Sequence, residues 1–200
     1  MKKLTVLLIT ILLILLIYNL FCNHKPNYVS ISDVSINNNL INLNKLGKYN
    51  SFYSPTIIDA YQDIKNNKTI KVDGEIFYLK KVLRESDMVV ISLGMRELSS
   101  NNFDKMYEDI VFLINELKKY AFGKIIFLGY YNPTNYYDSN TDKIFYDINS
   151  KLNRLMMDNN ITYIPLYELI KGNNYKEKYS FILNSEGINK INSILTMHFK

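Results

Sequence analysis

The sequence predicts a three-layer α/β domain, in which a short parallel sheet carries helices on both faces and right-handed crossovers join the strands. Short apolar runs bounded by polar or glycine-containing segments are typical of buried parallel strands. Longer segments with apolar residues at positions i, i+3, i+4 and i+7 predict helices. The two kinds of segment alternate along most of the 200-residue chain, which is long enough for one domain with a substantial core.

Four apolar runs are expected to form the strands of this sheet. They are Tyr28–Ile31, Met88–Leu93, Lys124–Gly129 and Ile161–Pro165. The segment KTIKVDGEI, residues 68–76, predicts an additional hairpin, because Asp73-Gly74 is a favoured two-residue hairpin turn. The asparagine-rich segment from Ile36 to Tyr53 is weakly patterned, and we expect no strand in it.

The clearest helical pattern starts at Phe103, where Asn101 or Asn102 is a suitable N-cap, and Gly123 is a suitable stop. Its inward-facing residues are expected to be Phe103, Met106, Ile110, Leu113, Ile114 and Leu117.

A second helix is expected over Asp142–Asp158 and a third from Ser185 to about Phe199. The inward-facing residues of these two helices are expected to be Ile144, Phe145, Ile148, Leu152 and Leu155, and Ile188, Ile191 and Leu195. Two further helices are expected near Thr56–Lys65 and Phe77–Ser86, on either side of the hairpin.

The composition excludes several classes of function. The formal net charge of +5 is spread along the chain, and its densest cluster, Lys118 and Lys119, is typical of a solvated helix face. We therefore expect no nucleic-acid partner. The 7 glycines form no phosphate-binding loop, and no His, Cys or paired carboxylates have metal-ligand spacing, so we expect no metal and no cofactor. Cys22 is the only cysteine, which excludes a disulfide within the chain.

The amino terminus predicts a membrane anchor. After Met1-Lys2-Lys3, the segment Leu4–Phe21 carries no charge, and at about 1.5 Å per residue it would span roughly 27 Å. Lysines ahead of an apolar segment favour the cytoplasmic side, so we expect a single-pass protein of the cell membrane whose carboxyl-terminal domain is extracytoplasmic. The expected organisation is an anchor over residues 1–22, a linker over 23–27 and a domain over 28–200.

Two alternatives to an uncleaved anchor stay open. A cleaved signal peptide is disfavoured because the apolar run exceeds a usual signal core and no small-x-small site follows it. Lipidation of Cys22 is disfavoured because Leu20 and Phe21 are bulky where a lipobox has small residues.

Three sequence blocks, taken in order, give the chain a resemblance to the SGNH or GDSL hydrolase family of esterases and lipases. YVSISDVSINN resembles the family's first strand and its Gly-Asp-Ser turn, and VVISLGMREL resembles the strand that ends in Gly-x-Asn-Asp. FILNSEGINKI resembles the segment that opens the last helix, and LRESDMVVIS and IIFLGYYNP are similar to a bacterial branch of the family. The resemblance covers Tyr28 to the end of the chain and implies a flavodoxin-like αβα domain.

The resemblance also implies where an active site would lie. In the family a serine attacks an ester carbonyl, a histidine removes its proton, an aspartate orients the histidine, and backbone amides with an asparagine hold the oxyanion. In this chain the serine position is Val34, the histidine position Ile182, the aspartate position Tyr179 and the asparagine position Arg96. Ser32, Asp33, Gly94 and Glu97 complete this degenerate site.

A further block of the family, which carries an oxyanion glycine, should follow a second strand. We find no such block, and we therefore expect the region to be deleted and the sheet to lack an edge strand.

Neighbouring residues are poor substitutes for the missing groups. Ser35 lies one residue past the nucleophile position, and such a shift turns a side chain to another face of the backbone. His24 precedes the first expected strand, and His198 lies near the end of the last helix. Loss of the nucleophile or the base alone can cost about a million-fold in turnover.

The residues that remain at this turn have more than one interpretation. Arg96 is expected to pair with Glu97 or Asp33 and to fill the former cleft, and alternatively to bind an anionic group of a cell-wall or lipid molecule. Tyr131 and Asn132, with other tyrosines of the same loop, could bind a cell-envelope glycan or a protein, or could simply pack the loop. The tyrosines in question are Tyr130, Tyr136 and Tyr137.

Three hypotheses about function follow. The first is an anchored, extracytoplasmic protein that has lost ester hydrolysis and acts in binding or scaffolding. The second is an active ester hydrolase with a displaced catalytic group. The third is that the apolar segment Leu4–Phe21 is itself the working part, assembling with other membrane proteins.

Overall fold

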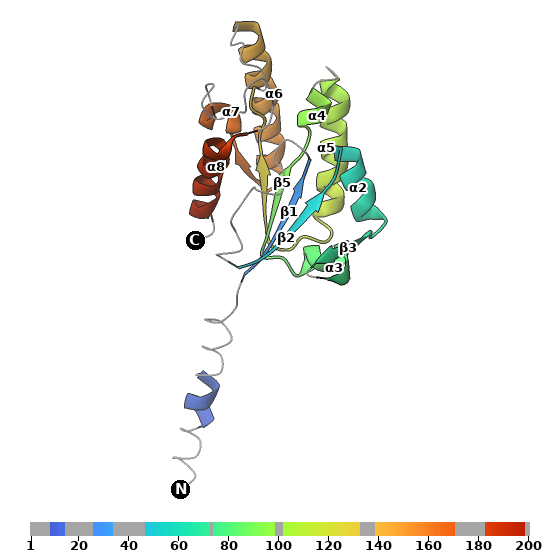
Figure 1. Ribbon diagram of the computed structural model, residues 1–200, viewed down its shortest axis with the longest axis vertical. Coiled ribbons are helices and arrows are strands. Elements are labelled where there is room, and N and C mark those ends of the chain that lie inside the picture. The colour runs from blue at the N-terminus through green and yellow to red at the C-terminus, as the bar shows by residue number, and fades with distance from the viewer. Residues whose placement is uncertain are drawn as a thin grey trace.

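The computed structural model describes residues 9–14, 26–33, 47–72, 74–98, 102–132, 139–170 and 183–198 of the chain. Over these residues it forms the α/β architecture that the sequence predicts, with a parallel sheet between layers of helices (Figure 1). The sheet has five strands in the order β2-β1-β5-β6-β7, and every neighbouring pair is parallel. The strands are β1 (Asn27–Ser32), β2 (Lys48–Tyr53), β5 (Met88–Ser92), β6 (Lys124–Leu128) and β7 (Thr162–Ile164).

The order of the strands fixes where a site can form. The chain leaves β1 towards β2 on one side, whereas β5 and the later strands lie on the other side, so β1 and β5 flank a topological switch point. Ser32 lies opposite Ser92 in the register, and the next residue, Asp33, donates its backbone N–H to the Ser92 carbonyl at 3.0 Å. The segments that follow these two strands therefore meet at the carboxyl edge of the sheet.

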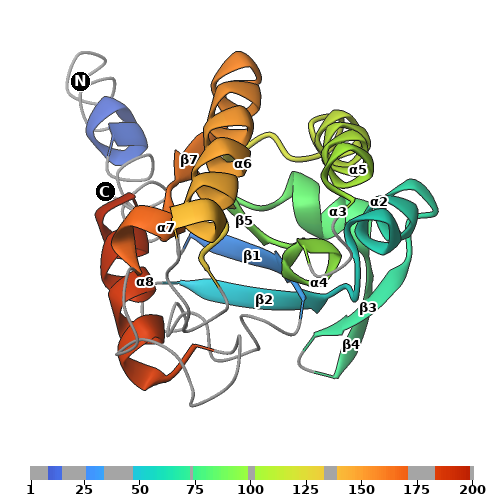
Figure 2. The same cartoon turned by 90° about the horizontal axis from the view of Figure 1, so that it is seen from above.

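Helices cover both faces of the sheet. Right-handed crossovers that step from β2 towards β7 place α2, α5 and α6 on one face, and α8 lies on the opposite face (Figure 2). Tyr61 of α2 and Phe112 of α5 bring their rings within 6.0 Å where these helices pack together. The helices are α2 (Ile57–Lys65), α3 (Leu79–Arg84), α4 (Met95–Leu98), α5 (Phe103–Leu117), α6 (Ser139–Asp158), α7 (Leu166–Leu169) and α8 (Ser185–His198).

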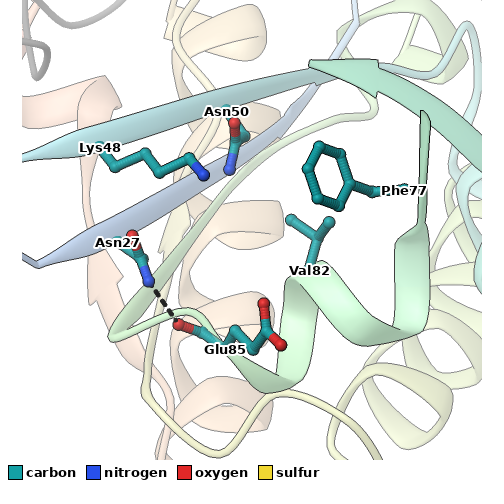
Figure 3. A pocket seen from close by; sticks show the side chains of 6 residues that line it. All are labelled: Asn27, Lys48, Asn50, Phe77, Val82 and Glu85. Atoms are coloured by element: carbon teal, nitrogen blue, oxygen red, sulfur yellow. Dashed lines mark hydrogen bonds between the residues drawn. The ribbon is translucent and has the colours of Figure 1, made fainter. Parts of the chain in front are cut away.

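The predicted hairpin is confirmed and lies outside the main sheet. Its strands β3 (Thr69–Val72) and β4 (Glu75–Tyr78) pair antiparallel, and Gly74 has the positive φ of +90° that such a tight turn requires. The hairpin and α3 close against the amino ends of β1 and β2, where they leave a cavity of only about 30 Å³ (Figure 3).

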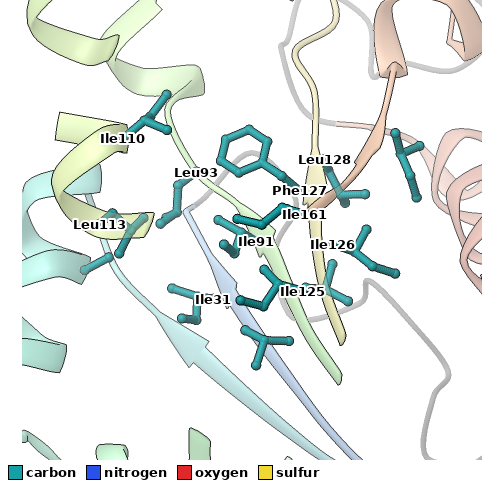
Figure 4. Packing of buried hydrophobic residues seen from close by; sticks show 14 of the residues in the cluster. Ile31, Ile91, Leu93, Ile110, Leu113, Ile125, Ile126, Phe127, Leu128 and Ile161 are labelled. Carbon is teal, nitrogen blue, oxygen red and sulfur yellow. The ribbon is translucent and has the colours of Figure 1, made fainter. Parts of the chain in front are cut away.

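The strand segments are unbroken apolar runs because the core surrounds them on both faces of the sheet. Ile31, Ile91 and Ile126, on the three central strands, are completely buried because helices cover both sides of the sheet. Leu113 and Ile110 of α5 pack over them from one face (Figure 4).

The expectation that the sheet lacks an edge strand is wrong. Strand β2 pairs with β1 along its whole length, from Lys48 opposite Asn27 to Tyr53 opposite Ser32. Within β2 only Phe52 is buried, because the strand forms an edge of the described sheet. Its sequence, KYNSFY, therefore lacks the apolar run of a central strand, and the sequence pattern did not reveal it.

Three of the predicted helices begin or end at other residues than expected, and one of them, α6, begins at Ser139 rather than Asp142. Helix α5 has Asn102 as its N-cap, as predicted, but it ends before Lys118 rather than at Gly123. Helix α3 begins only at Leu79, because Phe77 and Tyr78 continue the hairpin strand β4.

One residue of α6 faces the other way from the prediction. Ile144 is 46% exposed, and Met156 is buried in addition to Phe145, Ile148 and Leu152. Ile144 instead lines the open groove between α5 and α6.

Of the expected anchor Leu4–Phe21, the structure describes residues 9–14, which are helical. The five apolar side chains there are exposed, so this segment adds nothing to the core. Among the residues that the structure describes, no helix combines the length and apolar character needed to cross a membrane.

The buried side chain of Asn149 fixes the segment after β6 to helix α6. Its Oδ1 accepts the backbone N–H of Tyr130 at 2.9 Å and the hydroxyl of Tyr163, and its Nδ2 donates to the Tyr130 carbonyl at 3.1 Å. Nδ2 also donates to the Phe145 carbonyl at 2.7 Å, so the amide is fully used. One side chain thus holds three separate elements together.

Replacement of this amide should be costly. We expect Asn149→Ala to lower the free energy of unfolding by about 3 kcal/mol, because it leaves the buried N–H and C=O of Tyr130 without partners. Asn153→Ala, an exposed site one turn later on the same helix, should change it by less than about 0.5 kcal/mol. Guanidinium unfolding of the full chain in mild detergent would measure the free energy of unfolding of both variants. Equal effects of the two substitutions would contradict the role assigned to Asn149.

Candidate functional site

Asp33, at the carboxyl end of β1, is the centre of the candidate site. Its buried side chain accepts the backbone N–H groups of Gly94 and Met95 at 3.1 and 3.2 Å. Hydrogen bonds from backbone N–H groups stabilise a buried carboxylate that would otherwise be costly. Asp33 therefore binds the turn after β5 to the end of β1, which is where the sequence blocks placed the degenerate site.

Gly94 is required in this turn for two reasons. Its φ of +104° favours glycine, and a Cβ atom added there would overlap the hydroxyl oxygen of Tyr130 and approach Ile57 Cδ1 to 3.0 Å. The Tyr130 ring thus lies directly against the backbone of Gly94. The space above Gly94, beside the Asp33 carboxylate, is filled by an aromatic side chain.

Tyr130 is completely enclosed at this edge. Its ring packs edge to face on Phe127, with centroids 6.4 Å apart, and its hydroxyl has no hydrogen-bond partner among the described residues. Burial raises the pKa of the Tyr130 hydroxyl well above its ordinary value, and the charges of Glu97 and Asp33 raise it further. The hydroxyl is therefore neutral and cannot serve as a base at physiological pH.

Glu97, on the short helix α4, reaches across to the beginning of α2. Its Oε1 accepts the backbone N–H of Ile57 at 2.7 Å, so the carboxylate lies at the positive end of that helix. Burial raises the pKa of the Glu97 carboxyl, and the charges of Asp33 and Asp109 add to this, although hydrogen bonds from the backbone oppose it. Glu97 thus places a second carboxylate in the site beside that of Asp33, and the first residue of α2 holds it in position.

The segment that follows β2 contains no glycine. Its residues are Ser54, Pro55 and Thr56, and Thr56 is the N-cap of α2, where its hydroxyl accepts the Asp59 N–H. The N–H of Ser54 is already donated to the Ser32 carbonyl at 2.9 Å, and Pro55 has no N–H. The second strand is present, contrary to expectation, but Ser54 and Pro55 offer no free backbone donor for an oxyanion.

We had expected Arg96 to fill the former cleft. Its side chain is instead exposed at the rim. Tyr131 and Asn132 are buried instead of forming an accessible wall, and burial raises the pKa of the Tyr131 hydroxyl. Over its described residues, the aromatic loop that the sequence indicated as a recognition surface is part of the packing. Val34, Tyr179, Ile182 and the other candidates Ser35, Tyr136, Tyr137 and His24 lie outside the described residues.

His198 lies at the opposite edge of the sheet from the candidate site. Its carbonyl accepts the Lys124 ammonium group at 3.1 Å, and Lys124 is the first residue of β6. At about 3.3 Å per residue, the five residues of β6 separate the two edges by roughly 13 Å. The imidazole of His198, whose pKa is lowered by burial and by Lys124, is too far away to act at Gly94.

Sequence inspection missed Ser54 as a site residue, and it expected Tyr130 on an accessible loop rather than packed against Gly94. The signal for Ser54 was the Ser-Pro-Thr segment before the apolar pattern of α2, since such an N-cap in an α/β fold follows a strand. Nothing local indicates the inward direction of Tyr130, which depends on Asn149, 19 residues later.

Removal of the Tyr130 hydroxyl, which has no partner among the described residues, should stabilise the fold. We expect Tyr130→Phe to raise the free energy of unfolding by about 1 kcal/mol, since a buried hydroxyl without a partner is unfavourable. Tyr163→Phe is the matched control, because its hydroxyl bonds to Asn149, and it should lower the value by about 1 kcal/mol. Denaturant unfolding would distinguish the two, and a destabilised Tyr130→Phe would refute the packing described.

Neutralisation of Glu97 should make stability less dependent on pH. Because the pKa of Glu97 is raised in the folded state, the folded chain binds this proton more tightly than the unfolded chain. Its contribution to stability is then greatest below the unfolded pKa of about 4.3 and falls as pH rises through the folded pKa. Glu97→Gln keeps an oxygen for Ile57, so its stability relative to the wild type should grow between pH 4 and 7.

The control for this experiment is Glu108→Gln, which alters an exposed carboxyl on α5. Unfolding curves at several pH values would be compared for the three proteins. A Glu97→Gln advantage that shrinks with rising pH would contradict the direction of the pKa shift.

Several solved structures share this fold over most of their length. The lipase Lip_vut3 from a goat rumen metagenome has a TM-score of 0.66 and 13% identity, covering 86% of this chain and 97% of that one. A variant of the acetyl-xylooligosaccharide esterase Axe2 from Geobacillus has a TM-score of 0.64 and 10% identity, covering 87% and 94%. TesA has a TM-score of 0.61 and 11% identity, covering 87% and 98%.

The comparison rests on structure, because no family model matches the sequence and no curated protein matches it. A lipolytic protein of the G-D-S-L family from Veillonella parvula is also similar, with a TM-score of 0.62 and 11% identity over 86% of this chain and 96% of that one. Identities at this level are evidence of fold alone. The domain of this chain therefore has the fold of the SGNH/GDSL hydrolases, as its three sequence blocks predicted.

Proposed function

We propose that this protein is a membrane-anchored, extracytoplasmic pseudoenzyme of SGNH fold, which has lost ester hydrolysis and acts in binding or scaffolding. The observation that carries the proposal is the filling of the carboxyl edge at Gly94. The Tyr130 ring occupies the space against Gly94, and the N–H groups of Gly94 and Met95 are donated to Asp33. Among the described residues, an ester carbonyl would find neither space nor free donors at this point.

The chemistry of the substituted positions supports the same conclusion. A guanidinium group at Arg96 donates hydrogen bonds but cannot accept a proton, and the side chains at Val34 and Ile182 are hydrocarbons. The hydroxyl groups of Ser32, Ser54 and Ser92 are buried, so a displaced nucleophile among them would be closed to an ester. A nucleophile needs both an adjacent base and access to its substrate.

The apolar amino-terminal segment supports the anchor. Residues 9–14 are helical and present their apolar side chains outward, which is stable when lipid surrounds them. The lysines that precede Leu4–Phe21 favour an orientation in which the domain is outside the cytoplasm.

A binding role is supported by the surface near the filled edge. Arg96 is exposed at the rim, and an open groove of about 910 Å³ lies between the first turns of α5 and the middle of α6. Phe103, Tyr107 and Tyr146 line this groove together with charged side chains from both helices. Aromatic and charged groups in one groove suit a cell-envelope glycan, lipid or protein segment.

The loss of catalysis is tested by incubating the full chain in detergent with p-nitrophenyl acetate and a fluorophosphonate probe. We expect hydrolysis at the buffer rate and no stoichiometric labelling, while a serine esterase run in parallel is labelled and active. Labelling of one serine per chain, abolished by Ser54→Ala or Ser35→Ala, would instead establish an active hydrolase with a displaced nucleophile.

A further inference from the structure

The amino edge of the sheet carries three large apolar side chains that are strongly exposed. Phe122 is 74% exposed, Met157 68% and Met197 66%. Phe122 follows α5, Met157 lies in the last turn of α6, and Met197 lies in the last turn of α8. Three helices thus end at this edge with an apolar side chain outside the core.

Hydrogen bonds bring these three helix ends together around the start of β6. Lys118, just after α5, donates to Asn159 Oδ1, just after α6, at 3.1 Å. Lys124, the first residue of β6, donates to the carbonyl of His198 at the end of α8, also at 3.1 Å. These contacts place the three helix ends beside one another, and we call this region the amino-edge surface, defined by Phe122, Met157 and Met197 with Lys118 and Lys124.

The turn that carries Phe122 is held rigidly. A Cβ atom added at Gly123 would overlap the backbone carbonyls of Ser86 and Asp87, so this turn packs directly against the chain before β5. The N–H of Lys124 donates to the Asp87 carbonyl at 2.9 Å, which fixes the turn further. Phe122 is thus presented on an ordered segment.

The charge of this edge is complementary to anionic lipid. Lys118 and Lys124 have neutral partners, an amide and a carbonyl, so their charges are not neutralised by those contacts. Lys80 and Arg84 lie nearby, because both contact the Tyr120 ring. Lys80 Nζ lies 4.6 Å and Arg84 Cζ 5.3 Å from the centroid of that ring. The carboxylates of the same region are Glu85, Asp87, Glu116 and Asp158, and Glu116 is paired with Lys119.

The chain enters the domain at the same edge. The N–H of Asn27, the first residue of β1, donates to Asp87 Oδ2 at 2.7 Å, and its Nδ2 donates to the Glu85 carbonyl at 3.1 Å (Figure 3). Only residues 22–26 separate β1 from Phe21, and at about 3.5 Å per residue they reach roughly 20 Å at most. If Leu4–Phe21 spans the membrane, as the proposed function holds, this edge must lie close to the bilayer.

We propose that the amino-edge surface docks on the outer leaflet of the bilayer. Phe122, Met157 and Met197 enter the interfacial region, and Lys118 and Lys124 bind the phosphate groups of anionic phospholipids. The inference rests on the proposed anchor. Its consequence is that the carboxyl edge, with Asp33, Arg96 and Glu97, points away from the membrane.

The test uses the full chain in lipid nanodiscs with Cys22→Ser as background. A fluorophore is attached at Phe122→Cys or, as the matched control, at Asp104→Cys, an exposed site at the opposite edge of the sheet. With nitroxide-labelled phosphatidylglycerol discs, we expect at least threefold stronger quenching at position 122 than at position 104. Equal quenching at the two positions would overturn the docking.

A second comparison separates docking from simple proximity. With the fluorophore at Lys119→Cys, the triple variant Phe122→Ser, Met157→Ser and Met197→Ser should reduce quenching to the level of position 104. Ile144→Ser, an exposed apolar site elsewhere on α6, should leave it unchanged. Equal quenching in phosphatidylcholine and phosphatidylglycerol discs would overturn the role of the lysines.

Failure of the anchor itself is recognised independently. Alkaline carbonate washing of membranes releases a chain that lacks a spanning segment, whatever the domain does. A chain that resists the wash but shows no quenching at position 122 refutes the docking and leaves the anchor intact.

Discussion

The structure depends above all on the buried carboxylate of Asp33, which accepts hydrogen bonds from two backbone N–H groups. Gly94 and Met95 donate these hydrogen bonds, and they hold the turn after β5 against the end of β1. Once this turn is fixed, α4 begins there, Glu97 reaches the N-terminus of α2, and Gly94 offers the flat surface on which Tyr130 packs. Because a buried carboxylate without donors would be costly, this arrangement is strongly constrained.

The proposed loss of ester hydrolysis rests on the same arrangement. A hydrolytic site needs an open space, free donors aimed at a developing oxyanion and a proton acceptor beside a nucleophile. At this edge Tyr130 takes the space, Asp33 takes the donors and Pro55 supplies none. The Asn149 amide stabilises this filled state, because it fixes the backbone of Tyr130 from both its N–H and its carbonyl.

The two edges of the parallel sheet have different properties. Over the described residues of the carboxyl edge, the Tyr130 ring fills the space at Gly94, and the carboxylates of Asp33 and Glu97 accept backbone N–H groups. The amino edge is held together by Lys118 and Lys124 and exposes apolar side chains at the ends of three helices. Since all strands point the same way, a chain that is tethered ahead of β1 turns its amino edge towards the tether and its carboxyl edge away from it.

The sequence by itself determined the α/β class, four of the five strands of the sheet, the hairpin turn at Asp73-Gly74 and the main helices, because periodicity and caps are local properties. It also predicted that Asp33 and Gly94 lie together, since they follow two strands that parallel pairing brings side by side. Only the tertiary structure decided that KYNSFY is a strand, because an edge strand has few buried positions and owes its conformation to pairing with β1. Likewise, the burial of Tyr130 and Tyr131 and the exposure of Arg96 depend on contacts between distant segments, which no local pattern records.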